Sequence, residues 1–231
     1  MKHWLIVGAS RGLGLALARN VCAEGARVTA VAQRAEAKHA ALEAEQGGRL
    51  QYTHADVRSE PELQAAASGL PAGTRFDVLV YNSAIHLEHD GKDIEHCSPE
   101  ALLETLDVNA VGAARVVKHF RRFLANDGRL VFISSEAGSI TNAGRAAEYG
   151  YCMSKAALNM LAKLLANRER KLGSAVQVVT LNPGWMRTDM GGAQAHISAE
   201  EAAESIVKAL VARPASEAPL FVDRHGQPLP W

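Results

Sequence analysis

Short apolar runs alternate with longer stretches of helical character along the chain. Apolar runs of about four to eight residues predict buried strands, and apolar positions at helical spacing predict helices. The sequence predicts strands at 3–7, 27–32, 50–54, 77–81, 128–134, 175–181 and 220–222. We expect helices to start near Gly12, Glu36, Glu60, Pro99, Tyr149 and Ala199. Because buried strands that alternate with helices form parallel sheets, helices should cover both faces of the sheet.

Nothing in the sequence divides this pattern into separate domains. The chain has 231 residues, a length that suits one large domain better than two small ones. No linker rich in Pro or Gly interrupts the alternation. We therefore predict an α/β fold in one domain over residues 1–231, a single doubly wound parallel sheet of the Rossmann type.

The helix that starts near Tyr149 is apolar around most of its circumference. An outer helix needs only one apolar stripe to cover a sheet. Its apolar residues are Ala156, Ala157, Leu158, Met160, Leu161, Ala162, Leu164, Leu165 and Ala166. We expect a second copy of the chain to cover the other side, in a homodimer or homotetramer. The alternative is that other parts of the same chain cover it.

The composition narrows the class of protein. Lys plus Arg number 25, as do Asp plus Glu, and no run of five like charges occurs. This balance argues against binding to nucleic acid or to a membrane surface. Three widely spaced cysteines, an odd number, indicate a reducing compartment. Because we find neither a signal peptide nor an apolar run of membrane-spanning length, we expect a cytoplasmic protein.

A glycine-rich turn follows the first predicted strand and opens directly into a helix. Its sequence is GASRGLG, with the spacing GxxxGxG. Glycine allows a tight turn and a close approach of backbone N–H groups to a pyrophosphate at the helix N-terminus. The alternative is a purely structural turn. The candidate dinucleotide-binding residues here are Gly8, Ser10, Arg11, Gly12, Leu13 and Gly14.

The end of the second strand indicates which dinucleotide binds. Gln33 and Arg34 stand where a carboxylate would bind the ribose of NAD. Arg11 can reach the same region, and a charge-assisted hydrogen bond from either guanidinium to a 2′-phosphate is worth about 1.5 to 3 kcal/mol. The sequence therefore predicts NADP, with NADPH preferred over NADH. The alternative for Arg34 is a solvated residue at a helix start.

The third and fourth strands also end in candidate cofactor residues. Asp56 and Val57 follow the third strand, and Asn82 and Ser83 follow the fourth. Ligands of open α/β sheets bind at these carboxyl ends. Asp56 could accept a hydrogen bond from the adenine amine, and the small residues after the fourth strand leave room for the cofactor. The alternative for Asp56 is a helix cap.

The fifth strand and the following helix supply candidate catalytic groups. Ser134 and Ser135 end the strand, and Tyr151 and Lys155 lie four residues apart, on one helical face. A cation about 4 Å from a phenol contributes roughly 4 kcal/mol at an effective dielectric of 20, or about three pKa units before any loss to desolvation. Burial of the phenolate opposes this effect, so we predict a direction and not a value. We therefore expect Lys155 to lower the pKa of Tyr151, which would then exchange protons near neutrality.

Together these residues resemble the short-chain dehydrogenase and reductase family, from Val7 to the C-terminus. The motifs in the family's order are the glycine turn, Asp56, Asn82, Asn109, Ser135, Tyr151, Lys155 and the run Asn182-Pro183-Gly184. Gly138-Ser139-Ile140, the stretch 153–160 and the Pro-Trp ending are similar to the sniffer and C-factor branch of carbonyl reductases. Val7 and Tyr81-Asn82-Ser83-Ala84 depart from the usual family pattern.

The resemblance implies the NADPH-dependent reduction of a small ketone or aldehyde to an alcohol, reversible in principle. It implies that Tyr151 donates the proton, that Ser135 rather than Ser134 holds the substrate oxygen and that Lys155 also holds the nicotinamide ribose. Asn109 would position a water in the proton relay. Pro183 and Gly184 would approach the nicotinamide, and Thr188 would bind its carboxamide.

Several alternatives stay open at this point. A protein of this fold that binds NADP for regulation or signalling, with weak catalysis, would share the cofactor site but would not need a proton donor. Trp185, Met186 and Met190 either line the substrate pocket or pack a loop. His86, His89, His96 and Cys97 have no familiar metal-ligand spacing, so we expect no metal site.

Overall fold

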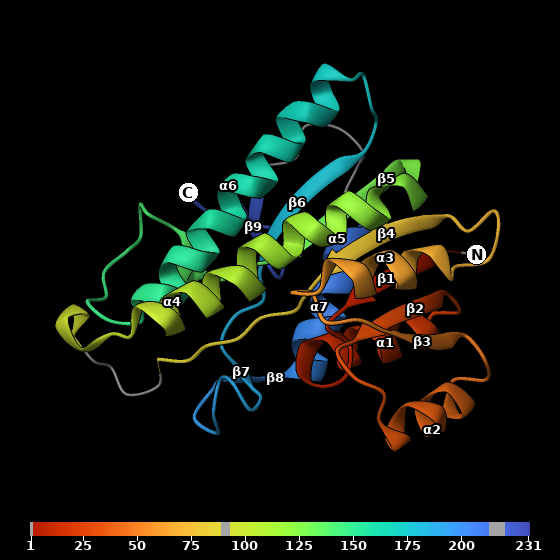
Figure 1. Cartoon of the computed structure of the whole chain (residues 1–231), viewed down its shortest axis with the longest axis horizontal. Coiled ribbons are helices and arrows are strands. Elements are labelled where there is room, and N and C mark those ends of the chain that lie inside the picture. Colours follow the sequence, from red (N-terminus) through yellow and green to blue (C-terminus); the bar gives the residue numbers. More distant parts are fainter. Residues whose placement is uncertain (1, 89–92, 213–219) are drawn as a thin grey trace.

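The computed structural model of the chain describes residues 2–88, 93–212 and 220–231. Within these ranges, seven strands form one parallel sheet in the order β3-β2-β1-β4-β5-β6-β9 (Figure 1). They are β1 (His3–Val7), β2 (Arg27–Ala32), β3 (Leu50–His54), β4 (Phe76–Tyr81), β5 (Leu124–Ile133), β6 (Gln177–Asn182) and β9 (Phe221–Asp223). Two short strands, β7 (Met186–Arg187) and β8 (Ile197–Ser198), pair separately. The predicted doubly wound sheet is thus confirmed.

Helices cover both faces of this sheet. They are α1 (Gly12–Ala23), α2 (Ala37–Glu45), α3 (Glu60–Ser68), α4 (Pro99–Leu106), α5 (Gly112–Phe120), α6 (Tyr149–Lys171) and α7 (Ala199–Ala212). α1 packs against α7, whereas α3 packs against α5 and α4 against α6 (Figure 1). Alternate residues of β1 enter two different cores, Trp4 and Ile6 on the α1–α7 side and Leu5 and Val7 on the other. Burial on both faces explains why the strand is a continuous apolar run.

The strand order reverses beside β1, and this reversal positions the site. β1 pairs with β2 on one side and with β4 on the other. The connections after β1 and β4 therefore leave the sheet toward opposite faces, which opens a crevice at the carboxyl ends of both strands. The glycine turn follows β1 and Asn82 follows β4, so the predicted cofactor residues lie at this crevice.

One irregular segment interrupts the helix that starts at Pro99. Asp107–Val111 forms a π-helical segment, η2, between α4 and α5. The apolar pattern runs through this segment without a break, so the sequence predicts an ordinary helix. π-Segments inside α-helices are frequent at functional sites, and this one carries Asn109.

None of the helices in the described ranges combines the length and the apolar character that a membrane crossing requires.

Candidate active site

The glycine turn packs so tightly against its surroundings that two of its glycines leave no room for a side chain. A Cβ on Gly14 would lie 2.1 Å from the carbonyl oxygen of Gly8, and a Cβ on Gly8 would lie 2.6 Å from Oγ of Ser83. Gly8 also has a φ of 88° and Gly12 one of 53°, a region that side-chain-bearing residues rarely adopt. Asn82 braces the turn, because its Nδ2 donates to the Gly8 carbonyl at 2.8 Å.

The turn leaves the N-terminus of α1 open toward the crevice. Arg11 occupies the N-cap position, and no side chain among the described residues caps the helix. The first N–H groups of a helix have no intrahelical partners and attract anions. This bare helix end, beside a turn that only glycine can form, fits the pyrophosphate of a dinucleotide. Gly12, Leu13 and Gly14 would hold it through their backbone.

The residues predicted to recognise the adenosine end lie near this helix terminus. Arg34 is exposed after β2. Arg11 forms an ion pair with Asp189 at 2.7 Å, and both side chains are about three-quarters exposed, 75% and 76%. Exposed pairs of this kind are weak, so Arg11 can exchange Asp189 for a phosphate at little cost.

Asp56 stands where it is predicted, after β3, but its carboxylate already has partners. Arg58 and Gln33 both donate to it, Gln33 at 2.9 Å. The hydrogen bonds from Arg58 hold the pKa of this carboxyl well below its usual range. Val57 turns its side chain into the core, leaving its backbone as the part that can reach a ligand. Binding of adenine by Asp56 stays a prediction.

Lys155 lies one turn after Tyr151 on α6 and is almost completely buried, with 2% of its surface exposed. Its Nζ donates to the carbonyl oxygen of Ile133 at 3.0 Å and lies 5.6 Å from the centroid of the Tyr151 ring. Burial lowers the pKa of Lys155 to about 8. The expected proximity of the two side chains is therefore present, with the ammonium anchored on the sheet.

The phenol of Tyr151 shares a hydrogen bond with Ser135. Burial raises the pKa of Tyr151 to about 12, although the hydrogen bond from Ser135 acts in the opposite direction. The expectation that Lys155 lowers this pKa was wrong for the chain alone. The physical reason is that desolvation of the phenolate outweighs the attraction of an ammonium that is itself buried and bound to Ile133.

The two candidate serines have different roles. Ser134 is buried and donates to Oδ1 of Asn159 at 2.7 Å, a contact inside the protein. Ser135 is half-buried, faces Tyr151 and accepts a hydrogen bond from the Ala137 N–H at 3.1 Å. The geometry therefore places Ser135, and not Ser134, beside the phenol of Tyr151.

The side-chain amide of Asn109, in η2, forms hydrogen bonds with the loop after β4 and with α6. Oδ1 accepts from the Ile85 N–H at 2.8 Å, and Nδ2 donates to the Ile85 carbonyl at 2.9 Å and to Oγ of Ser154 at 2.9 Å. These contacts tie the loop after β4 to η2 and α6. The role of Asn109 in holding a water stays a prediction.

The segment after β6 covers the opposite side of the crevice. Thr188 lies over the glycine turn, since a Cβ on Gly12 would be 3.5 Å from its methyl group. Pro183 is buried, and Gly184 has a φ of 84°. Trp185 is half-exposed, donates from Nε1 to the Gly191 carbonyl at 2.7 Å and packs against His196.

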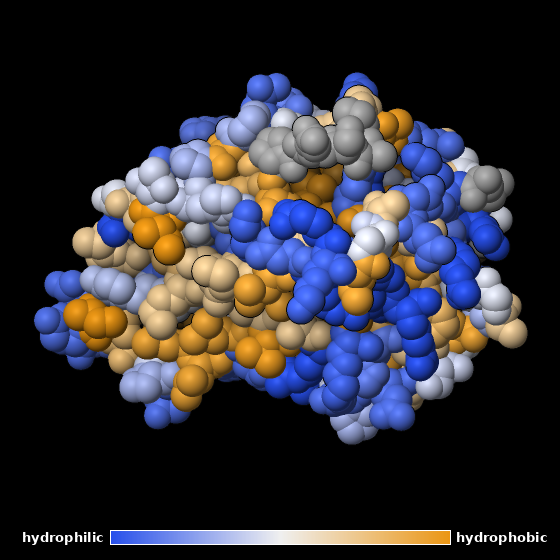
Figure 2. All heavy atoms as spheres, turned by 90° about the horizontal axis from the view of Figure 1, so that it is seen from above, coloured by the Kyte–Doolittle hydropathy of each residue, from blue (hydrophilic) through white to orange (hydrophobic). Residues whose placement is uncertain are grey.

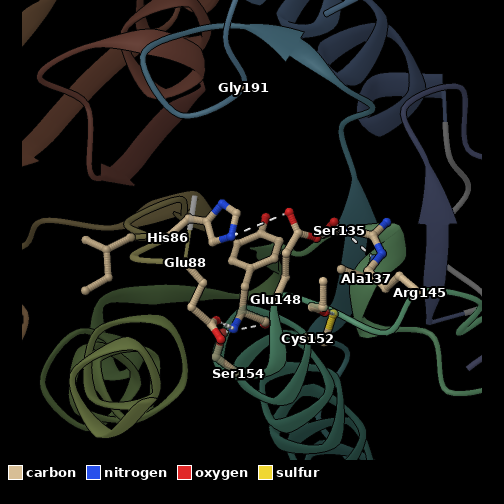
Figure 3. A network of polar contacts seen from close by, with 12 residues as sticks. His86, Glu88, Ser135, Ala137, Arg145, Glu148, Cys152, Ser154 and Gly191 are labelled. Atoms are coloured by element: carbon tan, nitrogen blue, oxygen red, sulfur yellow. Dashed lines mark hydrogen bonds and ion pairs between the residues drawn. The ribbon is translucent and has the colours of Figure 1, made fainter. Parts of the chain in front are cut away.

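A network of ionisable residues around Tyr151 was missed by the sequence analysis (Figure 3). Its members are His86, Glu88, Glu136, Arg145 and Glu148. Their spacing carries no signal, because tertiary packing brings the loop after β4 to the start of α6. No cluster of possible metal ligands occurs among the described residues. Of the histidines considered as ligands, His89 lies outside these residues.

Comparisons with known proteins agree with this geometry. A model of the short chain dehydrogenase family matches residues 2–198. C-signal of Myxococcus xanthus is 29% identical over 73% of this chain and 100% of its own, which confirms the resemblance to the sniffer and C-factor branch. A short-chain dehydrogenase/reductase structure from Burkholderia multivorans with bound NADP covers 100% of this chain and 99% of that one, with a TM-score of 0.92 and 29% identity. A carbonyl reductase of Pseudomonas aeruginosa PAO1 in complex with NADP covers both chains fully, with a TM-score of 0.87 and 33% identity. The chain belongs to the short chain dehydrogenase family.

Proposed function

We propose that this protein is a carbonyl reductase that uses NADPH to convert a ketone or aldehyde into an alcohol. The observation that carries the proposal is the protonated phenol of Tyr151, hydrogen-bonded to Ser135 at the crevice. The bound dinucleotide supplies a hydride for the carbonyl carbon. Tyr151 supplies the proton for the carbonyl oxygen, and Ser135 orients that oxygen by a hydrogen bond.

The raised pKa of Tyr151 means that the proton needed for reduction is present at neutral pH. With a pKa of about 12 in the chain alone, the phenol keeps its proton, and positive charge nearby must lower this pKa before the proton transfers readily. The reverse reaction, oxidation of an alcohol, begins by removing a proton and needs the phenolate. Positive charge near the ring, from Lys155 and from an oxidised nicotinamide, stabilises that phenolate. Reduction should therefore proceed at neutral pH, and oxidation should accelerate as the pH rises.

Replacement of Tyr151 by Phe tests the proton donor directly. We expect Tyr151→Phe to lower the kcat of NADPH-dependent reduction by about 10²- to 10⁴-fold, measured by the loss of nicotinamide absorbance with a panel of aldehydes and ketones. NADPH affinity, measured by fluorescence titration, should change little. The matched control is Tyr149→Phe, whose phenol bonds to Asp93 and Ala146 instead.

The same experiment separates the proposal from its alternative. If the wild-type protein binds NADPH but turns over no member of a broad panel, it is a cofactor-binding regulatory protein of the same fold. Full activity in Tyr151→Phe would equally contradict the proposed role of the phenol.

We propose NADP as the cofactor because two exposed arginines stand where its 2′-phosphate would lie. The NADP in the related Burkholderia and Pseudomonas structures supports this assignment. Arg34→Ala should weaken NADPH binding by about tenfold or more, the value of one charge-assisted hydrogen bond, and leave NADH binding nearly unchanged. Arg19→Ala, an exposed arginine further along α1, serves as the control. Equal losses for both dinucleotides would refute the assignment.

The remaining expectations are proposals too. We propose that the dinucleotide and substrate sites lie in one domain over residues 1–231, that the protein acts in the cytoplasm and that it assembles as a homodimer or homotetramer.

A further inference from the structure

The start of α6, the helix that carries Tyr151, departs from the usual helix N-terminus. Glu148 occupies the N-cap position with φ 60° and ψ 41°, in the left-handed region. Among the described residues, it is the only one other than glycine with a positive φ. This conformation costs a side-chain-bearing residue of order 1 kcal/mol and tends to persist where function requires it. The carboxylate of Glu148 makes no capping hydrogen bond.

A carboxylate from a distant loop caps the helix instead. Oε2 of Glu88 accepts a hydrogen bond from the N–H of Tyr151 at 2.9 Å. The chain makes room for this contact at Gly150, where a Cβ would lie 3.0 Å from the same oxygen and 2.8 Å from Leu102. Glu88 thus satisfies the helix end and complements its dipole. The carboxylate of Glu148 is therefore not needed to cap the helix and can make other contacts.

The released carboxylate turns toward the active site. Its Oε1 lies 3.6 Å from Nε2 of His86, and its Oε2 pairs with Arg145, which also binds Glu136. The His86 ring packs against the ring of Tyr151, with centroids 4.7 Å apart. Figure 3 shows the imidazole of His86 and the carboxylate of Glu148 pointing toward each other.

Charge and exposure indicate what this arrangement can bind. The His86 side chain is 10% exposed and that of Glu148 is 29% exposed, so the pair beside Tyr151 is mostly buried but still open to a small ligand. Each oxygen of Glu148 has one partner here and can accept a second hydrogen bond. Arg145 is already paired with the carboxylates of Glu136 and Glu148, and an anionic substituent beside Glu148 would meet a like charge. Because Arg145 already takes the ion-pairing position, a neutral hydrogen-bond donor fits best.

We propose that Glu148 and His86 form a polar subsite that binds a hydroxyl group on the carbon next to the substrate carbonyl. The inference rests on the proposed function, because the carbonyl oxygen must lie between Ser135 and Tyr151. The subsite makes the enzyme selective for α-hydroxy ketones over ketones without the hydroxyl. In the reverse direction it selects vicinal diols. A site built to hydrogen-bond a hydroxyl discriminates strongly against the analogue that lacks it.

The test uses the matched substrates 2-hydroxyacetophenone and acetophenone with NADPH. The wild-type protein should show a kcat/KM at least about tenfold higher for the hydroxy ketone, the worth of a hydrogen bond to a charged group. Glu148→Ala, which removes the acceptor, and His86→Phe should bring this ratio close to one, mainly through the KM of the hydroxy ketone. Glu95→Gln, an exposed carboxylate on the same loop, should keep the wild-type ratio.

A second variant distinguishes loss of the carboxylate from misfolding. Glu148→Gly removes the carboxylate and adopts the left-handed conformation without strain. The ratio should fall in this variant as in Glu148→Ala, with an unchanged circular dichroism spectrum. A ratio near ten in either well-folded variant would overturn the inference.

Failure of the subsite and failure of the proposed function give different results. If the wild-type protein reduces both ketones equally well, carbonyl reduction stands and the subsite is refuted. If it reduces neither, carbonyl reduction fails for these substrates, and calorimetric titration of the protein with NADP⁺ present still tests the subsite. It should bind 1-phenyl-1,2-ethanediol more tightly than 1-phenylethanol, and equal affinities would overturn the inference.

Discussion

Burial keeps two residues at the centre of the site, Tyr151 and Lys155, from ionising easily. Burial raises the pKa of Tyr151 to about 12 and lowers that of Lys155 to about 8. Both changes disfavour the charged forms, so the free protein keeps the tyrosine protonated. The positive charge needed to stabilise the phenolate is then greatest when oxidised cofactor is bound. Proton exchange by Tyr151 is therefore coupled to binding of the cofactor in the crevice.

The burial of Lys155 predicts a cost in stability. Below pH 8 the lysine is charged in both the folded and the unfolded chain, and folding carries the full desolvation cost. Between pH 8 and 10.5, the unfolded chain binds more protons, so this cost disappears as the pH rises. Lys155→Met should therefore be more stable than wild type at pH 7, by about 2 kcal/mol after the hydrogen bond to Ile133 is lost. Urea unfolding measures the difference.

The pH dependence provides the control for this prediction. The advantage of Lys155→Met should shrink between pH 7 and 10.5, whereas Lys163→Met, an exposed lysine of α6, should match wild type throughout. An advantage that does not change with pH would mean that packing, and not charge, produced it. The variant should in either case lose reductase activity, because the buried lysine is kept for its function although it lowers the stability of the fold.

At the scale of elements, the sequence predicts the features that local apolar pattern determines. β1, β2 and β3 begin and end where expected, and α1, α3, α4, α6 and α7 begin at the predicted residues, because apolar periodicity specifies them. The π-segment was not predicted, and its Asn109 meets Ile85 only through the tertiary packing of the loop after β4. The spacing of Tyr151 and Lys155 predicted that the two side chains lie close together, and their position after β5 together with the family resemblance made them the candidate catalytic pair. His86 and Glu88 were not identified, because only the packed loop brings them there.

The turn into α6 supports an element-scale prediction. Both Glu148→Gly and Glu148→Ala remove the carboxylate, so they differ only in the backbone freedom at φ 60°. Glycine adopts this conformation readily, whereas alanine costs about 1 kcal/mol or more there. We expect Glu148→Gly to have the higher free energy of unfolding by about that amount, measured in urea. Equal stabilities would show that α6 can start without the left-handed residue.

At the scale of the whole molecule, one helical layer exposes an unusual amount of apolar surface. Leu103 on α4 is 66% exposed, and Met160 and Leu164 on α6 are 59% and 57% exposed, although Leu158 and Ala162 of the same helix are buried. Figure 2 shows hydrophobic side chains gathered in a band across the face that carries α6. α4 and α6 pack against each other, so these exposed apolar residues lie on neighbouring helices. Large apolar patches of this kind mark interfaces.

This surface predicts that the protein associates with itself through α4 and α6. A symmetric dimer would place each α6 against its copy, and a stable interface of about 800 Å² per partner needs an apolar centre of this kind. Light scattering after size exclusion should give two or four times the chain mass for wild type. Met160→Glu and Leu164→Glu should give monomers, because a charge at the centre of an interface is costly to desolvate. Val211→Glu, an exposed apolar position on α7 in the opposite layer, should leave assembly intact. A monomeric wild type would refute the interface, and the exposed side of α6 would then face solvent.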